Sequence, residues 1–289
     1  MNSTEQIAAN EQNALHIQTL LETDGTLGSP IDLDIARMNV IELDPLKWIG
    51  MDVPPRKLKV TNTGFTVIVS AKWQDERPCL TGGPFQGRYI FGQIHFHWGK
   101  NEMNGSDHTI DGASMPMEIH VVHFKEEYET LESALKRPNG VIVLVYFCKL
   151  QNESNPFMEE IVKNLPTIRT AHSSIRINPF KLTDLLPAFS ADYFLYWGAI
   201  TTTQNVHSIL WIICREPIGI SIMQLAEFRT MKDEKGVPIL TNIRPLKGKH
   251  QRSVFHVCPS GSTYASLLPI PRDTQSIHTV KSTDSNETQ

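Results

Sequence analysis

The sequence predicts a mostly β (α+β) domain built on one large, twisted, mainly antiparallel sheet with short peripheral helices. Three observations lead to this prediction. Short segments rich in β-branched and aromatic residues recur between turn residues. Segments with helical spacing are few and short. Hydrophobic residues make up 40% and charged residues 20% of the 289 residues, a balance typical of a globular protein with a sizeable core.

Five segments carry the strongest strand patterns. Tyr89–Trp98 and Met117–Phe124 flank a polar, glycine-containing loop, so we expect them to pair as a long hairpin. Val141–Leu150 is a continuous apolar run, typical of a strand buried on both faces. Residues 57–70 alternate between polar and apolar with one glycine interruption, and residues 208–214 predict a further strand.

Helical spacing appears in residues 130–137, 156–165 and 221–231. The first of these segments stops at a Pro-Asn-Gly sequence, which ends helices. In the last, Ser221 is followed three residues later by Gln224, the pattern of a capping box. These helices are too few to form a layer of their own, so we expect them at the periphery.

We expect one domain spanning residues 27–258, with the polar residues 1–26 and 259–289 as mobile tails. Within the first tail, leucines give only a weak helical pattern. Four cysteines form no CxxC pair and are expected to be reduced thiols. The N-terminal segment lacks the basic start and apolar core of a signal peptide. We therefore expect a cytoplasmic protein, and a monomer.

Charge and hydropathy argue against two classes of partner. The formal net charge is −4 and the pI about 6.3, so electrostatics gives no reason to expect nucleic acid or an anionic membrane. The basic positions Arg244, Lys247, Lys249, His250 and Arg252 form a short run that we expect to be solvated surface. No stretch approaches the roughly 20 apolar residues of a membrane span. A small-molecule substrate remains as the expected partner.

Three histidines predict a metal site. His95 and His97 lie two residues apart in one predicted strand, so their imidazoles face the same side. If the two strands pair as a hairpin, His120 can lie across from them. Three imidazoles without an obvious fourth protein ligand are typical of catalytic zinc, with one position open for water. Such a site generates hydroxide near neutral pH. We therefore expect Zn²⁺ as cofactor.

An isolated His-x-His pair has a competing interpretation, two partly buried histidines bonded to backbone groups. Gln93 and Glu118 argue against it. Each lies two residues before a predicted ligand on the same strand face, where it can accept the ring N–H that a metal does not use. His108 and His123 are further candidates, but we expect both to be buried structural histidines.

Several motifs occur in one order along the chain: Ser29-Pro30-Ile31-Asp32, Gly82-Gly83-Pro84, QIHFHWG at 93–99, SDHT at 106–109, MEIHVVHF at 117–124, Ile200-Thr201-Thr202 ahead of Trp211, and Asn242-Ile243-Arg244-Pro245. With these motifs the chain resembles an α-type carbonic anhydrase over most of its length. The resemblance implies a zinc ion at the bottom of a conical cavity in the sheet. It also implies reversible hydration of carbon dioxide to bicarbonate by zinc-bound hydroxide.

The resemblance also implies residue roles. The zinc ligands would be His95, His97 and His120, with Gln93, Glu118 and the main chain of Asn242 supporting them. Thr201 would link the reactive oxygen to an acidic partner, Asp107, where the family usually has glutamate. The apolar pocket for carbon dioxide would comprise Val122, Val143, Ile200, Thr202 and Trp211, for which plain core packing is the alternative.

The sequence departs from the family at the proton-transfer step. Phe65 occupies the position of the usual shuttle histidine, and its ring cannot relay a proton. Thr63 and Ile68 replace nearby polar residues, and Thr203-Gln204 replaces the usual Pro-Pro. The family's N-terminal aromatic cluster has no counterpart in residues 1–28. We therefore expect an active enzyme that is limited by proton release.

Two other functions remain open at this point. The chain could be a catalytically weak or silent relative that acts as a binding module. It could also be a zinc esterase for small esters. Retention of all three ligand histidines and of Thr201 argues against the silent alternative, and no feature of the sequence indicates a pocket for a larger ester.

Overall fold

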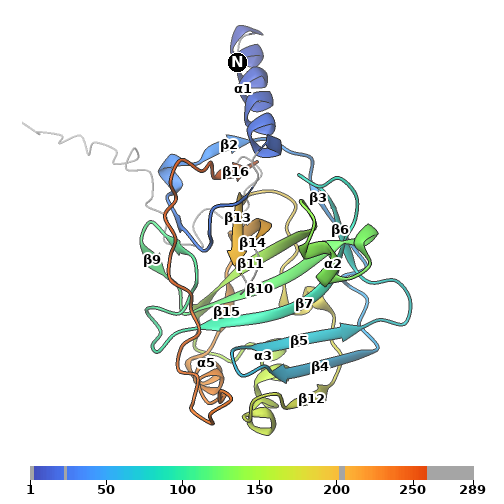
Figure 1. Cartoon of the computed structure of the whole chain (residues 1–289), viewed down its shortest axis with the longest axis vertical. Helices are drawn as coiled ribbons and strands as arrows, with labels where there is room; N and C mark the ends of the chain where they lie inside the picture. Colours follow the sequence, from blue (N-terminus) through green and yellow to red (C-terminus); the bar gives the residue numbers. More distant parts are fainter. Residues whose placement is uncertain (1–2, 23–24, 202–205, 259–289) are drawn as a thin grey trace, which may run out of the picture.

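The computed structural model describes residues 3–22, 25–201 and 206–258 (Figure 1). Its strands are β1 (Asp32–Leu33), β2 (Asn39–Ile41), β3 (Leu46–Ile49), β4 (Lys57–Asn62), β5 (Val67–Lys72), β6 (Cys79–Gly82), β7 (Tyr89–Trp98), β8 (Thr109–Ile110), β9 (Ala113–Ser114), β10 (Met117–Lys125), β11 (Val141–Leu150), β12 (Ser174–Ile177), β13 (Tyr193–Thr201), β14 (Val206–Cys214), β15 (Ile218–Ile220) and β16 (Phe255–Val257). The helices are α1 (Ser3–Glu22), α2 (Leu131–Leu135), α3 (Pro156–Val162), α4 (Leu182–Leu185) and α5 (Ile222–Phe228), with short 3₁₀ helices η1 (Ile35–Arg37), η2 (Glu126–Tyr128) and η3 (Leu165–Ile168).

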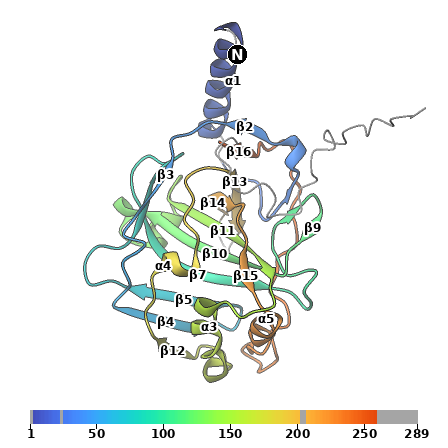
Figure 2. The same cartoon turned by 180° about the vertical axis from the view of Figure 1, so that it is seen from behind.

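One large mixed sheet organises the described chain. Thirteen strands belong to it, and its main path runs β12-β4-β5-β7-β10-β11-β14-β13-β16-β2. Pairing is antiparallel except between β11 and β14, β11 and β15, and β16 and β2. Figure 2 shows α3, α4 and α5 at the margins of this sheet. The predicted fold, a large and mainly antiparallel sheet with short peripheral helices, is confirmed.

The centre of the sheet is the hairpin of β7 and β10. The two strands pair antiparallel from Met117 opposite Trp98 to Lys125 opposite Tyr89, with one register shift after Val122. Both strands are almost entirely buried. The predicted ranges for these strands, 89–98 and 117–124, agree with the structure, because the apolar pattern that identified them is the one the core requires.

Both faces of the sheet are covered by apolar packing, and β11 shows this directly. Ile142 and Leu144 belong to one buried cluster, while Val143 and Val145 belong to a second cluster on the opposite face. All four side chains are at most 3% exposed. This alternation confirms the prediction of a strand buried on both faces and explains its continuous apolar sequence.

The predicted helices are present but shorter than their patterns. In α5 the backbone N–H of Gln224 donates to the Ser221 hydroxyl, and the Ser221 N–H donates to the Gln224 side chain, both at 3.2 Å. The expected capping box is therefore confirmed. In α2, Thr130 caps the first turn, and the helix ends at Leu135, two residues before the end of its pattern.

The N-terminal segment contains the longest described helix, α1, which stands away from the sheet (Figures 1 and 2). Its second half is tied to the domain: Leu20 is 3% exposed, and a ring nitrogen of His16 lies 2.7 Å from the carbonyl oxygen of Val40 in β2. Part of the segment predicted as a tail thus packs against the domain. The predicted C-terminal tail, 259–289, lies outside the described residues.

Among the described residues, no helix combines the length and the apolar character needed to cross a bilayer.

Candidate metal centre

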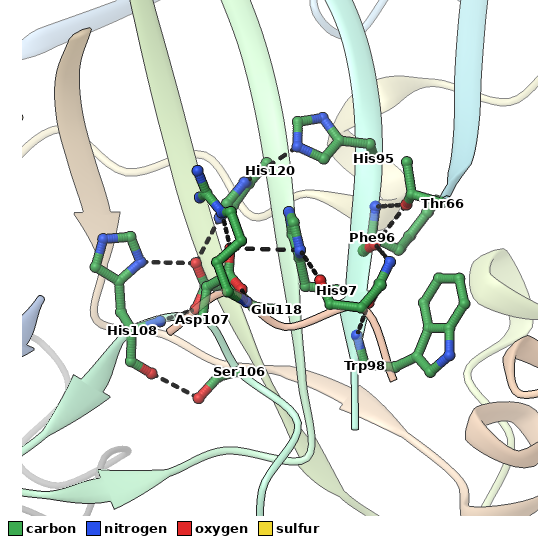
Figure 3. Close-up of polar contacts among 12 residues, drawn as sticks. Thr66, His95, Phe96, His97, Trp98, Ser106, Asp107, His108, Glu118 and His120 are labelled. Carbon is green, nitrogen blue, oxygen red and sulfur yellow. Dashed lines mark hydrogen bonds and ion pairs between the residues drawn. The ribbon is translucent and has the colours of Figure 1, made fainter. Parts of the chain in front are cut away.

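Three histidines converge on one face of the sheet. His95 and His97 extend from β7, and His120 lies directly opposite His95 on β10. The Nε2 atom of His95 lies 3.2 Å from Nδ1 of His120. One ring nitrogen from each of the three side chains lies within 4.8 Å of the other two. Figure 3 shows the rings gathered above the strands.

This geometry fits a tetrahedral metal ion. Zinc–nitrogen bonds of 2.0–2.1 Å at tetrahedral angles place two ligand nitrogens about 3.3 Å apart, close to the observed separation of His95 and His120. The Nε2 atom of His97 is buried and has no hydrogen-bond partner. A buried nitrogen without a partner is costly, and a shared cation would satisfy it.

The electrostatics favour the form of histidine that binds metals. Burial lowers the pKa of His95, His97 and His120, and for His95 and His120 the charge of neighbouring imidazoles lowers it further. The rings are therefore neutral near pH 7. Neutral imidazole is the metal-ligating state, so the fold keeps the three side chains ready to bind a cation.

Fixed acceptors orient two of the three rings. Oε1 of Glu118 lies 2.5 Å from Nε2 of His120, and the main-chain oxygen of Asn242 lies 3.3 Å from Nδ1 of His97. Glu118 is fully buried, which by itself raises its pKa, but the proximity of His108 and its hydrogen bonds lower that pKa overall. A carboxylate acceptor fixes the tautomer of His120 and directs its Nδ1 toward the other histidines.

The expected contact between Gln93 and His95 is not formed. Oε1 of Gln93 and Nδ1 of His95 are both buried, and neither has a hydrogen-bond partner. Residues two apart in a strand are separated by about 6.6 Å, so the contact depends on the side-chain rotamers and not on the strand alone. The structure therefore gives His95 no fixed acceptor among the described residues.

Asp107 is held by an arginine that sequence reasoning missed. The carboxylate is 1% exposed; Oδ1 accepts a hydrogen bond from the backbone N–H of Arg244 at 2.7 Å, and Oδ2 accepts one from Nε of Arg244 at 2.8 Å. Oδ2 also lies 3.3 Å from Nδ1 of His97. The guanidinium of Arg244 packs 5.6 Å from the ring centroid of Trp211. The predicted partner of Asp107, the hydroxyl of Thr201, lies outside the described side chains.

Two positions of the basic run are therefore not solvated surface. Besides Arg244, the side chain of Arg252 is enclosed: the residue is 7% exposed, and its guanidinium donates to the carbonyl oxygens of Leu27, Gly28 and Gly248. Arg244 binds a buried carboxylate, and Arg252 binds main-chain oxygens of two other segments. Except for Gly248, the partners of these arginines are distant in sequence. The charges of neighbouring residues therefore could not predict these contacts.

A cavity of about 810 Å³ opens over the three histidines. Of the five predicted pocket residues, four line it, namely Val122, Val143, Ile200 and Trp211, while Thr202 lies outside the described residues. Phe65 also lines it and is 71% exposed. Sequence reasoning missed the apolar side chains that α2 contributes, Leu131 and Leu135, because helix spacing alone does not show which cavity a helix faces.

His108 and His123 are buried, as expected. His108 belongs to a hydrogen-bonded chain: its Nδ1 lies 2.8 Å from Glu118, and its Nε2 lies 2.6 Å from the hydroxyl of Tyr196. His108, Glu118 and His120 are close enough to share an ion, but these hydrogen bonds already occupy the carboxylate. Burial lowers the pKa of His123 to about 4, and its ring packs edge-on against Phe91.

Comparison with known proteins decides the family. Residues 12–258 match the sequence model of eukaryotic-type carbonic anhydrases. The chain belongs to this family. Human carbonic anhydrase 7 is 37% identical over 206 residues, which cover 68% of this chain and 77% of that protein. Carbonic anhydrase 1 of Monodelphis domestica is 35% identical over 241 residues, covering 80% and 90%, and that of Oryctolagus cuniculus is 33% identical over 240 residues, covering 80% and 100%.

Membership in the carbonic anhydrase family accounts for the arrangement of the sheet and the histidine cluster. It supports hydration of carbon dioxide as the general chemistry, and zinc as the metal that fits the cluster. Near the histidine cluster lie Asp107, which is held by Arg244, and Phe65 at the cavity wall.

We predict that Arg244→Met lowers the free energy of unfolding by about 1–3 kcal/mol, because the buried Asp107 carboxylate loses a charged donor. Arg37→Met is the matched control, since Arg37 pairs with Asp34 but its side chain is 81% exposed, and its effect should be much smaller. Urea unfolding followed by tryptophan fluorescence measures both. Equal effects of the two substitutions would show that the Asp107 contact contributes nothing special.

Proposed function

We propose that this chain catalyses the reversible hydration of carbon dioxide to bicarbonate with a zinc ion held by His95, His97 and His120. One observation carries the proposal: three imidazoles, two of them buried and one partly buried, direct nitrogens to a common point at the base of a largely apolar cavity. Of the inward nitrogens, Nε2 of His97 has no hydrogen-bond partner, and those of His95 and His120 contact only each other.

When bound, zinc supplies Lewis-acid chemistry, which in carbonic anhydrases brings the pKa of coordinated water to about 7. The protein residues do the rest. Glu118 and the Asn242 carbonyl fix the orientation of His120 and His97. The low pKa of the three imidazoles keeps protons from competing with the metal.

The cavity suits a small apolar gas. Val122, Val143 and Trp211 lie within it beside the histidines and are at most 6% exposed. Carbon dioxide needs no hydrogen-bond donor to enter such a pocket. An apolar wall also limits the number of waters that solvate the reacting atoms, which strengthens electrostatic interactions inside the site.

We propose that Thr201 and Asp107 together orient the proton on the reactive oxygen. The backbone of Thr201 pairs with Val206 at the end of β13, beside Ile200 at the cavity wall. Asp107 is an acceptor held by Arg244. A threonine hydroxyl that donates to such a carboxylate can accept only from a reactive oxygen that carries a proton. The pair would therefore select the protonated form of that oxygen.

The remaining expectations complete the proposal. Residues 27–258 would form the catalytic domain, acting as a monomer in the cytoplasm. The family match covers residues 12–258 and thus includes this whole range. All four cysteines are free thiols, in keeping with a reducing compartment.

We predict that the purified protein accelerates carbon dioxide hydration in a stopped-flow indicator assay, and that dipicolinate treatment reduces the rate to background until zinc is restored. His120→Ala should abolish both the rate and the zinc content, because it removes one of three ligands. His250→Ala, at an exposed histidine, is the control and should retain both. Hydration unaffected by zinc removal, or a fully zinc-loaded protein without activity, would refute the proposed function.

Replacement of Phe65 by histidine should raise kcat at low buffer concentration by at least about tenfold, because a titrating group then stands at the cavity wall. The value of kcat/KM should change little, since it does not depend on proton release. Phe65→Leu is the control for loss of the ring. If Phe65→Leu raised kcat as much as Phe65→His, access to the cavity rather than proton transfer would be limiting.

A further inference from the structure

Three loops meet at the cavity rim beside Gly64, and one buried side chain joins them. Asn62 is 0% exposed. Its amide nitrogen donates to the carbonyl oxygens of Arg169, at 2.9 Å, and Lys232, at 3.1 Å, while its amide oxygen accepts from the backbone N–H of Gly64 at 2.9 Å. The turn between β4 and β5 is therefore fixed against two segments more than 100 residues away in sequence.

This junction places the side chains of His172 and Glu234 next to the cavity wall. The backbone N–H of His172 donates to the Asn62 carbonyl at 2.8 Å, and Nε2 of His172 lies 3.2 Å from Oε1 of Glu234. A Cβ added to Gly64 would lie 3.4 Å from Cγ of Glu234. Gly64, Phe65 and Asp233 line the cavity, so the pair stands directly behind its rim.

Few of the described residues that line the cavity can accept a proton. Among the described residues that line the cavity, the titratable ones are the three clustered histidines, Asp233 and Arg244. Oδ1 of Asp233 already accepts from the backbone N–H groups of Lys235 and Val237, both at 2.9 Å. Phe65 has no titrating group.

We propose that His172, whose ring lies beside the Glu234 carboxylate, receives the protons that leave the cavity and passes them to buffer, in place of the histidine that Phe65 replaces. This inference rests on the proposed hydration activity. An O–H bond of a cavity water breaks, the proton moves through intervening waters past Gly64, and an N–H bond forms on the His172 ring. That N–H bond then breaks as a buffer base takes the proton.

The His172–Glu234 pair suits both the uptake of a proton from the cavity and its release to buffer. The side chains of His172 and Glu234 are 67% and 62% exposed, so buffer molecules reach them. Imidazole is the side chain that takes up and releases protons near neutral pH. The Glu234 carboxylate stabilises the imidazolium formed after the first half and holds the ring at the rim.

The test is His172→Asn, which removes the imidazole but suits the backbone, because His172 has φ +63° and asparagine tolerates this conformation. We expect kcat at low buffer concentration to fall by at least about threefold, with kcat/KM unchanged and with recovery on addition of imidazole. His250→Asn is the matched control, since His250 is exposed and also has positive φ, +52°. It should leave kcat unchanged.

Two further measurements separate a relay from a structural role. Zinc content and Tm of His172→Asn should match those of the parent protein. Unchanged kcat in His172→Asn, a parallel loss of kcat and kcat/KM, or no recovery on addition of imidazole would overturn the inference. An inactive parent protein would instead refute the proposed function on which it rests.

Discussion

The antiparallel register of β7 and β10 determines the relative positions of the three histidines in the candidate metal centre. It sets His120 opposite His95, and the two-residue period of β7 adds His97 on the same face. A slip of one residue would turn the ligands of one strand into the core. Pairing with β11 on one side and β5 on the other prevents such a slip, because the apolar side chains of these strands are buried in the two clusters.

Hydrogen bonds and ion pairs connect His97 and His120 to the polar groups around them. Glu118 orients His120 and is itself held by the backbone N–H and ring of His108. Asp107 contacts His97 and is held by Arg244. Each buried carboxylate therefore has charged or polar partners, as burial requires. Some buried polar atoms of the described chain have no hydrogen-bond partner, and two of them, Nε2 of His97 and Nδ1 of His95, belong to the candidate site.

Local sequence patterns predicted the parts of this structure that depend on neighbouring residues. The strands that carry the histidines, the doubly buried β11 and the capping box of α5 all follow from spacing within one segment. Contacts between distant segments could not be predicted this way. The Asp107–Arg244 pair joins residues 137 apart, and the His172–Glu234 pair joins residues 62 apart. The helix α1 gave only a weak pattern because most of its surface is exposed and needs no apolar stripe.

The central claim is that His95, His97 and His120 together bind one zinc ion and leave a position open. X-ray absorption spectroscopy at the zinc edge of the purified protein tests it most directly. We expect one zinc per chain, with three imidazole nitrogens and one oxygen at roughly 2.0–2.1 Å. A zinc shell with sulfur, with fewer than three imidazoles, or with a fourth protein ligand in place of the oxygen would contradict the account.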